Sequence, residues 1–258
     1  MNTHTDDGFR LMTVAASHRI ASRMQRLRLT GENLSRFNTF ANLHIRLYVP
    51  RDSSETLPRP VLSSYGRPVL SNQLDCYVMR YYTIRDIDAE AGWIDIDFVL
   101  HEDTGPACDF ARCAQPGDIC GISGPCGKSV KPAKHYLLAG DETALPAIAR
   151  ITKSLPDDAK GLILIDTHDA VGMPEFTNPS GMAQRWISRR PGQKSESYIK
   201  SVCRAIGETA TATNDHFIWI AGEYSDCAAL RPHLGKIHKS RHINVSYWRA
   251  SSALETDK

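Results

Sequence analysis

The hydrophobic rhythm of the chain changes near residue 130, and this change limits the fold more than any other feature. Before it, short stretches alternate polar and apolar residues. In WIDIDFVL the apolar side chains face one way and the aspartates the other (Ile94, Ile96, Phe98; Asp95, Asp97). After it, apolar runs alternate with segments of helical spacing, which predicts βαβ units and a parallel sheet. We therefore predict a β-barrel or sandwich followed by an α/β unit, with the boundary within residues 127–135.

The expected elements follow from these patterns. In the first half, strands are expected in RMQRLRLTG, LHIRLYVP, DCYVMRYYTIRD and GWIDIDFVLH, and a helix in GPACDFARCA. In the second half, strands are expected in HYLLAGD, GLILIDTHD, HFIWIAGE and HINVSYW, and helices in TALPAIARITKSL, SYIKSVCRAIGE and CAALRPHLGKI. The segment HDAVGMPEFTNPSGM is rich in Pro, Gly and Asn and is expected to be a loop.

Composition excludes several classes of protein. The net charge is +2, so the whole chain shows no sign of binding nucleic acid. No run of about 18 apolar residues occurs, so no membrane span is expected. The first ten residues lack the apolar core of a secretory signal, which favours a cytoplasmic protein. The seven cysteines form no C-x-x-C pair, so neither a metal site nor an iron–sulfur cluster is expected.

Charge is distributed unevenly along the chain. No acidic residue lies between Gly8 and Gly31 or between Arg231 and Leu254, and both stretches are basic (Arg10, Arg19, Arg23, Arg26, Arg28; Arg231, Lys236, Lys239, Arg241, Arg249). Such stretches can focus the electrostatic field on an anionic ligand. An ordinary solvated surface balanced by acids elsewhere remains the alternative for each side chain.

The run YVMRYYTIRD places charged and aromatic residues on one strand. There Arg80 and Tyr82 share one face, and Tyr81 and Thr83 share the other. A flavin needs a flat wall and a cation for its pyrophosphate, which Tyr82 and Arg80 would supply. Tyr81 is expected to pack, and Arg85 to have another partner. Plain cross-strand pairing is the alternative reading of an isolated R-x-Y.

Two turns indicate binding at helix starts. The helix that begins with Gly105 and Pro106 would offer free amides to an anion, or it is simply a well-started helix. The strand HYLLAGD runs into a helix for which Thr143 is the expected N-cap. Ligands of open parallel sheets bind where such strands end. Glu223, at the end of another expected strand, would cap a helix or meet a ligand.

Several motifs, in order, resemble the FAD-dependent siderophore-interacting proteins, a family of ferric-siderophore reductases within the ferredoxin-reductase-like group. They are HIRLYVP, RYYTIR, IDFVLHEDTGPACDFA, GDICGISGPCG, YLLAGDETALPAIARI, IWIAGE and YWR, and they extend from about Arg10 to Arg249. The resemblance implies a six-stranded antiparallel FAD-binding barrel at residues 10–131 and a Rossmann-like NAD(P)H-binding domain at residues 132–250, with flexible ends at 1–9 and 251–258.

The resemblance also implies roles for individual residues. Arg80 would bind the FAD phosphates, Tyr82 would pack on the flavin, and Thr83 would bond near flavin N5. Further FAD contacts are implied for the strand end and the helix start (Val99, Leu100, His101; Gly105, Pro106, Ala107). Residues beside the nicotinamide would be Asp141, Glu142, Thr143 and Ala144, with Glu223 beneath them. Trp248 would lie by the flavin, although VSYWRASS lacks the glycines that usually flank Y-W-R in the family.

The activity implied is transfer of electrons from NADH or NADPH through FAD to a ferric siderophore, by a monomer. A ferredoxin is an alternative donor. Basic residues near the last strand are the candidates to dock the siderophore (Lys239, Arg241, Arg249), as are those of QRWISRRPG (Arg185, Arg189, Arg190). Two rival functions are a general flavin or ferredoxin-type reductase and a siderophore-binding protein without turnover. Asp166 ends the second strand of the nucleotide domain and would disfavour a 2′-phosphate, which slightly favours NADH.

Overall fold

The computed structural model describes residues 8–51, 57, 76–101, 105–170, 172–189 and 195–250. The chain divides into two compact units between Ser129 and Val130, inside the stretch where the rhythm of the sequence changes. The ends expected to be flexible lie outside the described residues at 1–7 and 251–258, whereas Phe9 already belongs to the first strand.

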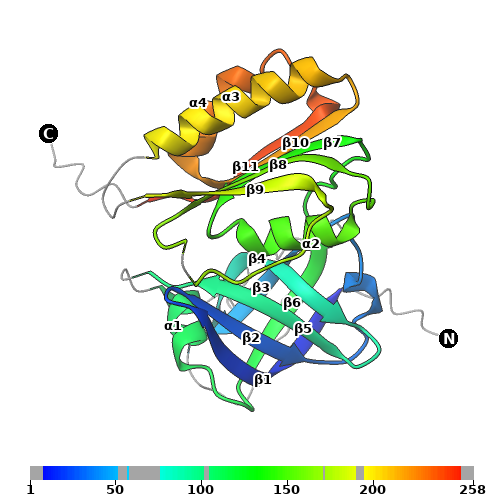
Figure 1. Cartoon of the computed structure of the whole chain (residues 1–258). Coiled ribbons are helices and arrows are strands. Elements are labelled where there is room, and N and C mark those ends of the chain that lie inside the picture. The colour runs from blue at the N-terminus through cyan, green and yellow to red at the C-terminus, as the bar shows by residue number, and fades with distance from the viewer. Residues whose placement is uncertain are drawn as a thin grey trace, which may run out of the picture. The chain divides into compact units, whose positions relative to one another are not determined.

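The first unit is a closed antiparallel barrel, as predicted (Figure 1). Its strands follow one another around the barrel in the order β1-β2-β5-β4-β3-β6. Their bounds are β1 Phe9–Ala21, β2 Met24–Thr30, β3 His44–Pro50, β4 Tyr77–Asp88, β5 Trp93–Val99 and β6 Ile119–Cys126. Patterning alone identified β2 to β5, and β1 and β6 complete the barrel by pairing with each other.

The alternation in β5 produces an apolar interior and a charged exterior. Ile94, Ile96 and Phe98 are fully buried in the barrel core. On the outer face, Asp95 and Asp97 lie opposite two arginines of β2, and each pair forms two hydrogen bonds of 2.6–2.8 Å (Arg28–Asp95, Arg26–Asp97). For these two arginines the sequence left open either an anion-binding surface or a surface balanced by acids elsewhere. The structure supports the second, because each arginine is paired with a carboxylate of β5.

Helix α1 (Pro106–Cys113) closes part of the barrel core. It contributes Ala107, Cys108 and Ala111 to the same apolar cluster as the barrel strands. Gly105 is its N-cap and Pro106 its first residue, so the helix begins where the sequence predicted. These contacts hold the start of α1 near the end of β5. Residues 102–104, between the two, lie outside the described residues.

The second unit is a five-stranded parallel sheet in the order β11-β10-β7-β8-β9. The strand bounds are β7 His135–Asp141, β8 Lys160–Thr167, β9 Gly181–Ser188, β10 His216–Glu223 and β11 His242–Trp248. Helix α2 (Leu145–Ser154) covers one face, and α3 (Glu196–Ala212) and α4 (Tyr224–Leu234) cover the other (Figure 1). Both faces of the sheet are covered, which explains why β7 and β10 are almost continuously apolar.

Strand β9 was not expected from the sequence. Its residues were placed among basic docking candidates, and the stretch before it was expected to be a loop. In the structure β9 pairs in parallel with β8 along its length, from Lys160 opposite Gly181 to Thr167 opposite Ser188. Strand β9 has few apolar residues because it lies at the edge of the sheet. Its sequence therefore resembles that of an exposed surface segment.

The sheet has a topological switch point. The chain runs outward from β7 through β8 to β9, and then returns to place β10 on the other side of β7. The carboxyl ends of β7 and β10, at Asp141 and Glu223, are therefore neighbours from which the chain departs in opposite directions. Crevices at such points are where open α/β sheets bind ligands. None of the helices that the structure describes is long and apolar enough to cross a membrane.

Candidate functional site

The β3–β4 register confirms the facing predicted for the R-x-Y pair. Arg80 lies opposite Leu47 and Tyr82 opposite Ile45, and both partners are fully buried barrel residues. The Tyr82 ring packs on Phe98, with 4.4 Å between the ring centroids. Tyr82 therefore packs against the barrel core, and Arg80, two residues before it, lies on the same side of the strand.

Arg80 and Thr83 both have unused bonding capacity. Arg80 is exposed, and its Nη1 donates a hydrogen bond of 2.9 Å to the carbonyl of Met79, the residue before it. No ion pair joins Arg80 to any residue within the described ranges. Thr83 is 6% exposed, and its hydroxyl has no hydrogen-bond partner in the same part of the chain. A cation and a hydroxyl three residues apart are thus available to a ligand.

Of two neighbours in this strand, one departs from expectation and the other agrees with it. Tyr81 was expected to pack, but its side chain is 61% exposed, with the Arg46 guanidinium carbon 5.9 Å from its ring centroid. Packing was a wrong prediction because the outer face of β4 is open at this position. Arg85 has the separate partner that its facing suggested, since its Nε lies 4.0 Å from Asp97 Oδ2.

The end of β5 leads into the start of α1. Val99 pairs with Met24, Leu100 is buried in the barrel core, and His101 is exposed. At the helix start, a Cβ added to Gly105 would meet no atom within 4 Å. The first-turn amides of a helix lack helical partners, and Pro106 removes one that would be unsatisfied anyway. The helix start is therefore open and rich in donors, whereas Ala107 is buried and can offer only its backbone.

These groups fit FAD. A flavin dinucleotide needs donors for two linked phosphates, a wall for its ring and a donor near N5. The open helix start and the uncommitted Arg80 provide cationic and amide donors. Tyr82 has the aromatic ring that such a wall needs. The Thr83 side chain points to the other face of β4, so only its backbone lies on the side of Tyr82.

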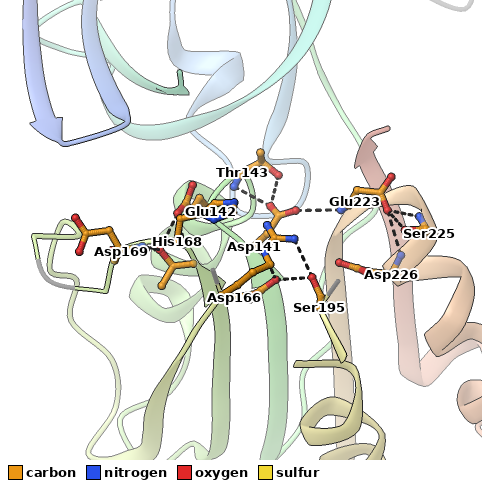
Figure 2. A network of polar contacts seen from close by, with 12 residues as sticks. Asp141, Glu142, Thr143, Asp166, His168, Asp169, Ser195, Glu223, Ser225 and Asp226 are labelled. Atoms are coloured by element: carbon orange, nitrogen blue, oxygen red, sulfur yellow. Dashed lines mark hydrogen bonds and ion pairs between the residues drawn. The ribbon is translucent and has the colours of Figure 1, made fainter. Parts of the chain in front are cut away.

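In the second unit, Asp141 lies at the centre of a hydrogen-bond network (Figure 2). Its Oδ1 accepts from the Thr143 amide at 2.8 Å and the Thr143 hydroxyl at 2.5 Å. Its Oδ2 accepts from the Glu223 amide at 3.0 Å and from Trp248 Nε1 at 2.7 Å. Burial raises the pKa of Asp141, and the bonds from Thr143 and Trp248 oppose that shift. Because four donors fill the carboxylate, Asp141 joins the ends of β7, β10 and β11.

Most of the other residues predicted beside the nicotinamide also form hydrogen bonds within the protein or are buried. Glu142 Oε1 accepts from the Thr167 hydroxyl at 2.7 Å and from the His168 amide at 2.9 Å, which fixes the end of β8 (Figure 2). Thr143 was expected to cap α2, but the N-cap is Ala144, and Thr143 bonds Asp141 instead. Ala144 is fully buried, so among these residues Thr143 alone has a partly exposed side chain.

Glu223 caps α4, one of the two roles expected of it. Its side chain accepts from the amides of Ser225 and Asp226 and from the Ser225 hydroxyl, and its Oε1 accepts from the Ala250 amide at 3.2 Å. Burial alone would raise the pKa of Glu223, but these hydrogen bonds outweigh it and lower the pKa below its usual value. Glu223 is therefore ionised and holds both a helix start and the chain beyond β11.

Asp166 is not presented to a ligand. It is 1% exposed, its Oδ2 accepts from the Ser195 hydroxyl at 2.8 Å, and Arg189 Nε lies 3.4 Å away. Burial raises the pKa of Asp166, and Arg189 and Ser195 oppose that rise. The sequence-based preference for NADH rested on a free carboxylate here, so it loses its physical basis. No pattern in the sequence indicated Ser195 as a partner of Asp166, because the contact depends on β9 and α3 lying beside β8.

The three basic residues predicted to dock the substrate do not come together. Lys239 and Arg241 form a short 3-10 helix before β11, where Arg241 lies 3.7 Å from Asp215. Arg249 follows the other end of the seven-residue β11 and stacks over the Tyr224 ring at 3.8 Å. At about 3.3 Å per strand residue, roughly 20 Å separates the two groups. Of the second basic group, Arg185 is exposed on β9, Arg189 is paired with Asp166, and Arg190 lies outside the described residues.

The cysteines of the described residues show no catalytic arrangement. Burial raises the pKa of both Cys120 and Cys227 to about 12, so these thiols stay protonated at neutral pH. No group of three or more His, Cys, Asp or Glu side chains suited to a metal ion occurs in the same part of the chain.

Family models match almost the whole chain. Residues 13–129 match the siderophore-interacting FAD-binding domain, and residues 133–251 match the siderophore-interacting protein domain. The division between the two matches agrees with the division between the two compact units.

Individual relatives agree with these matches. The ferric vibriobactin reductase ViuB of Vibrio cholerae is 28% identical over 93% of this chain and 89% of its own. The NADPH-dependent ferric-chelate reductase of Escherichia coli is 28% identical over 83% of this chain and 82% of its own. A solved siderophore utilization protein from T. fusca superposes with a TM-score of 0.79 at 32% identity, over 96% of this chain and 95% of its own.

More distant structures share the fold alone. The ferredoxin reductase of carbazole 1,9a-dioxygenase has a TM-score of 0.68 at 14% identity, over 93% of this chain and 68% of its own. The barrel and parallel sheet are thus arranged in sequence as in ferredoxin reductases. With its FAD-binding barrel and its nucleotide-type sheet, the chain belongs to the siderophore-interacting protein family.

Proposed function

We propose that this protein is an FAD-dependent ferric-siderophore reductase. It takes electrons from NADH or NADPH, passes them through FAD to a ferric siderophore, and releases Fe(II) in the cytoplasm. The observation that carries the proposal is the pairing of a barrel that fits FAD with a switch-point sheet in a chain of the siderophore-interacting family. Relatives named as ferric reductases support the same chemistry.

The chain's own residues bind and orient in this mechanism. When bound, FAD supplies an acceptor for two electrons from the nicotinamide and delivers them one at a time to iron. Arg80 and the start of α1 would hold the cofactor's phosphates, and Tyr82 would support its ring. Because the Thr83 side chain points to the other face of β4, its backbone N–H would supply the hydrogen bond near N5. Asp141 and Glu223 hold the ends of β7, β10 and β11 in register, so that the switch-point backbone keeps one shape for the nucleotide.

No acid, base or nucleophile in the protein is required for this reaction. Fe(III) in a siderophore is held by hard oxygen ligands, and Fe(II) binds such ligands more weakly. Reduction alone therefore loosens the metal. The basic residues that dock the siderophore are proposed to include Arg249, which the structure places beside Tyr224 near the carboxyl edge of the sheet.

Replacing Arg80 by alanine is expected to weaken FAD binding by roughly 10- to 100-fold. A hydrogen bond to a charged group contributes about 1.5–3 kcal/mol, and each 1.4 kcal/mol is about tenfold in affinity. The measurement is flavin content after purification, together with titration of the flavin-free protein by FAD. Arg80→Lys should retain part of the affinity, and Arg19→Ala, an exposed arginine of β1, should retain all of it. Full FAD content in Arg80→Ala would refute the role.

Steady-state rates with both nucleotides test the donor. Asp166 is buried at the end of β8 and paired with Arg189. It is therefore not presented as a free carboxylate that would repel a 2′-phosphate. The proposal therefore does not restrict the donor to NADH. Initial rates with NADH and NADPH over several ferric siderophores would establish both the donor and the acceptor.

A further inference from the structure

The acid-free N-terminal stretch contains one arginine whose position is unusual. Arg26 and Arg28 are paired with carboxylates of β5, and Arg10 donates to the carbonyls of Phe9 and Asn33. Arg19 and Arg23 form no ion pair with any described residue. Arg19 is exposed on β1, whereas Arg23 is half-buried in the turn that precedes β2.

Arg23 is fixed to the end of β5 by two hydrogen bonds. The Leu100 amide donates to the Arg23 carbonyl at 2.7 Å, which continues the β2–β5 ladder one step beyond Met24 and Val99. Arg23 Nε donates to the Leu100 carbonyl at 3.3 Å. The side chain therefore lies along the last residues of β5, on the path that leads to the start of α1.

Arg80 lies on the other side of the same residues. Strand β5 pairs with β2 on one side and with β4 on the other. The Ile84–Ile96 pair and the contact between the Tyr82 and Phe98 rings define the register of β4 and β5. Arg80 and Leu100 each lie two residues beyond that ring contact and face the same side as Tyr82 and Phe98. The two arginines therefore flank the end of β5 from opposite strands, close to the helix start that would receive phosphate.

The chemistry of Arg23 suits a phosphate. Its Nε is occupied by Leu100, which leaves both terminal amino groups as donors in a plane already fixed by the protein. A guanidinium presented in this way matches phosphate oxygens and loses little entropy on binding.

We propose that Arg23 binds the pyrophosphate of FAD together with Arg80 and the α1 start. The inference rests on the FAD binding of the proposed function and extends it to a residue outside the R-x-Y and G-P-A motifs. Arg23 then acts on the dinucleotide part of the cofactor and leaves the isoalloxazine ring untouched.

The test is titration of the full-length, flavin-free protein with FAD and, separately, with riboflavin, which lacks both phosphates. Arg23→Ala is expected to weaken FAD binding about 10-fold and to leave riboflavin binding unchanged. Its FAD affinity should also fall less steeply with added KCl than that of the unaltered protein, because one cation–phosphate contact is gone. Arg19→Ala is the matched control, and Arg23→Lys keeps the charge if the alanine variant folds poorly.

The outcomes separate the two proposals. Equal loss of FAD and riboflavin affinity in Arg23→Ala, or no loss of either, overturns the role of Arg23. If Arg80→Ala still loses FAD in that case, FAD binding by the barrel stands. If the unaltered protein binds no FAD at all, the proposed function fails with it.

Discussion

Asp141→Ala is expected to lower the free energy of unfolding by about 3–5 kcal/mol, because the carboxylate serves four donors from three parts of the second unit. Each buried donor left without a partner costs about 1–3 kcal/mol. The Glu223 amide is buried and has no nearby substitute, while the exposed side of Trp248 can recover part of its loss in water. The sum is at the high end for a single substitution.

Urea unfolding followed by tryptophan fluorescence measures this loss. Asp141→Asn should also destabilise, because its amide group would face N–H donors whichever way it is turned. Asp158→Ala, at an exposed position, is the matched control and should change stability by less than about 0.5 kcal/mol. A loss below about 1 kcal/mol in Asp141→Ala would show that the network does not hold the strand ends together.

Gly161→Ala is expected to cost about 4 kcal/mol or more, or to prevent the second unit from folding. Gly161 has a φ of +140°, which L-residues rarely adopt, and an added Cβ would lie 1.9 Å from the Tyr136 carbonyl oxygen. That oxygen belongs to the backbone of β7, so β7 and β8 would have to separate to relieve the overlap.

Gly207→Ala is the matched control for the glycine substitution. Gly207 lies inside α3, and a Cβ there would meet no atom within 4 Å. Alanine should raise stability by about 0.5–1 kcal/mol, because it removes the entropy cost of glycine in a helix. Thermal unfolding of both variants checks the pair, and similar melting temperatures for the two would contradict the role assigned to Gly161.

Much of the fold follows from patterns that are local in the sequence. The alternation in β5 predicted both its buried face and its charged face, since Asp95 and Asp97 would not lie in an apolar core. Strand β9 could not be predicted in this way. It is an edge strand whose identity depends on pairing with β8, and its own residues are as polar as a surface loop.

The site shows the same division between local and long-range information. The facing of Arg80 and Tyr82 depends only on strand period, and the register agrees with it. The hydrogen bonds that occupy the Asp141 carboxylate could not be predicted from the sequence, because its donors include Glu223 and Trp248, which are 82 and 107 residues away. The same holds for Asp166, whose partners come from two later elements, and for the separation of Arg241 from Arg249 along β11.

The central claim is tested most directly by the rate at which the purified, FAD-loaded protein produces Fe(II) from a ferric siderophore. The assay supplies NADH or NADPH and traps Fe(II) with a coloured chelator, and parallel reactions offer free flavin as the acceptor. A ferric-siderophore reductase is expected to reduce the ferric siderophore faster than free flavin. Faster reduction of free flavin would indicate a general flavin reductase. A protein that gains no flavin absorption band after addition of FAD and produces no Fe(II) would contradict the account.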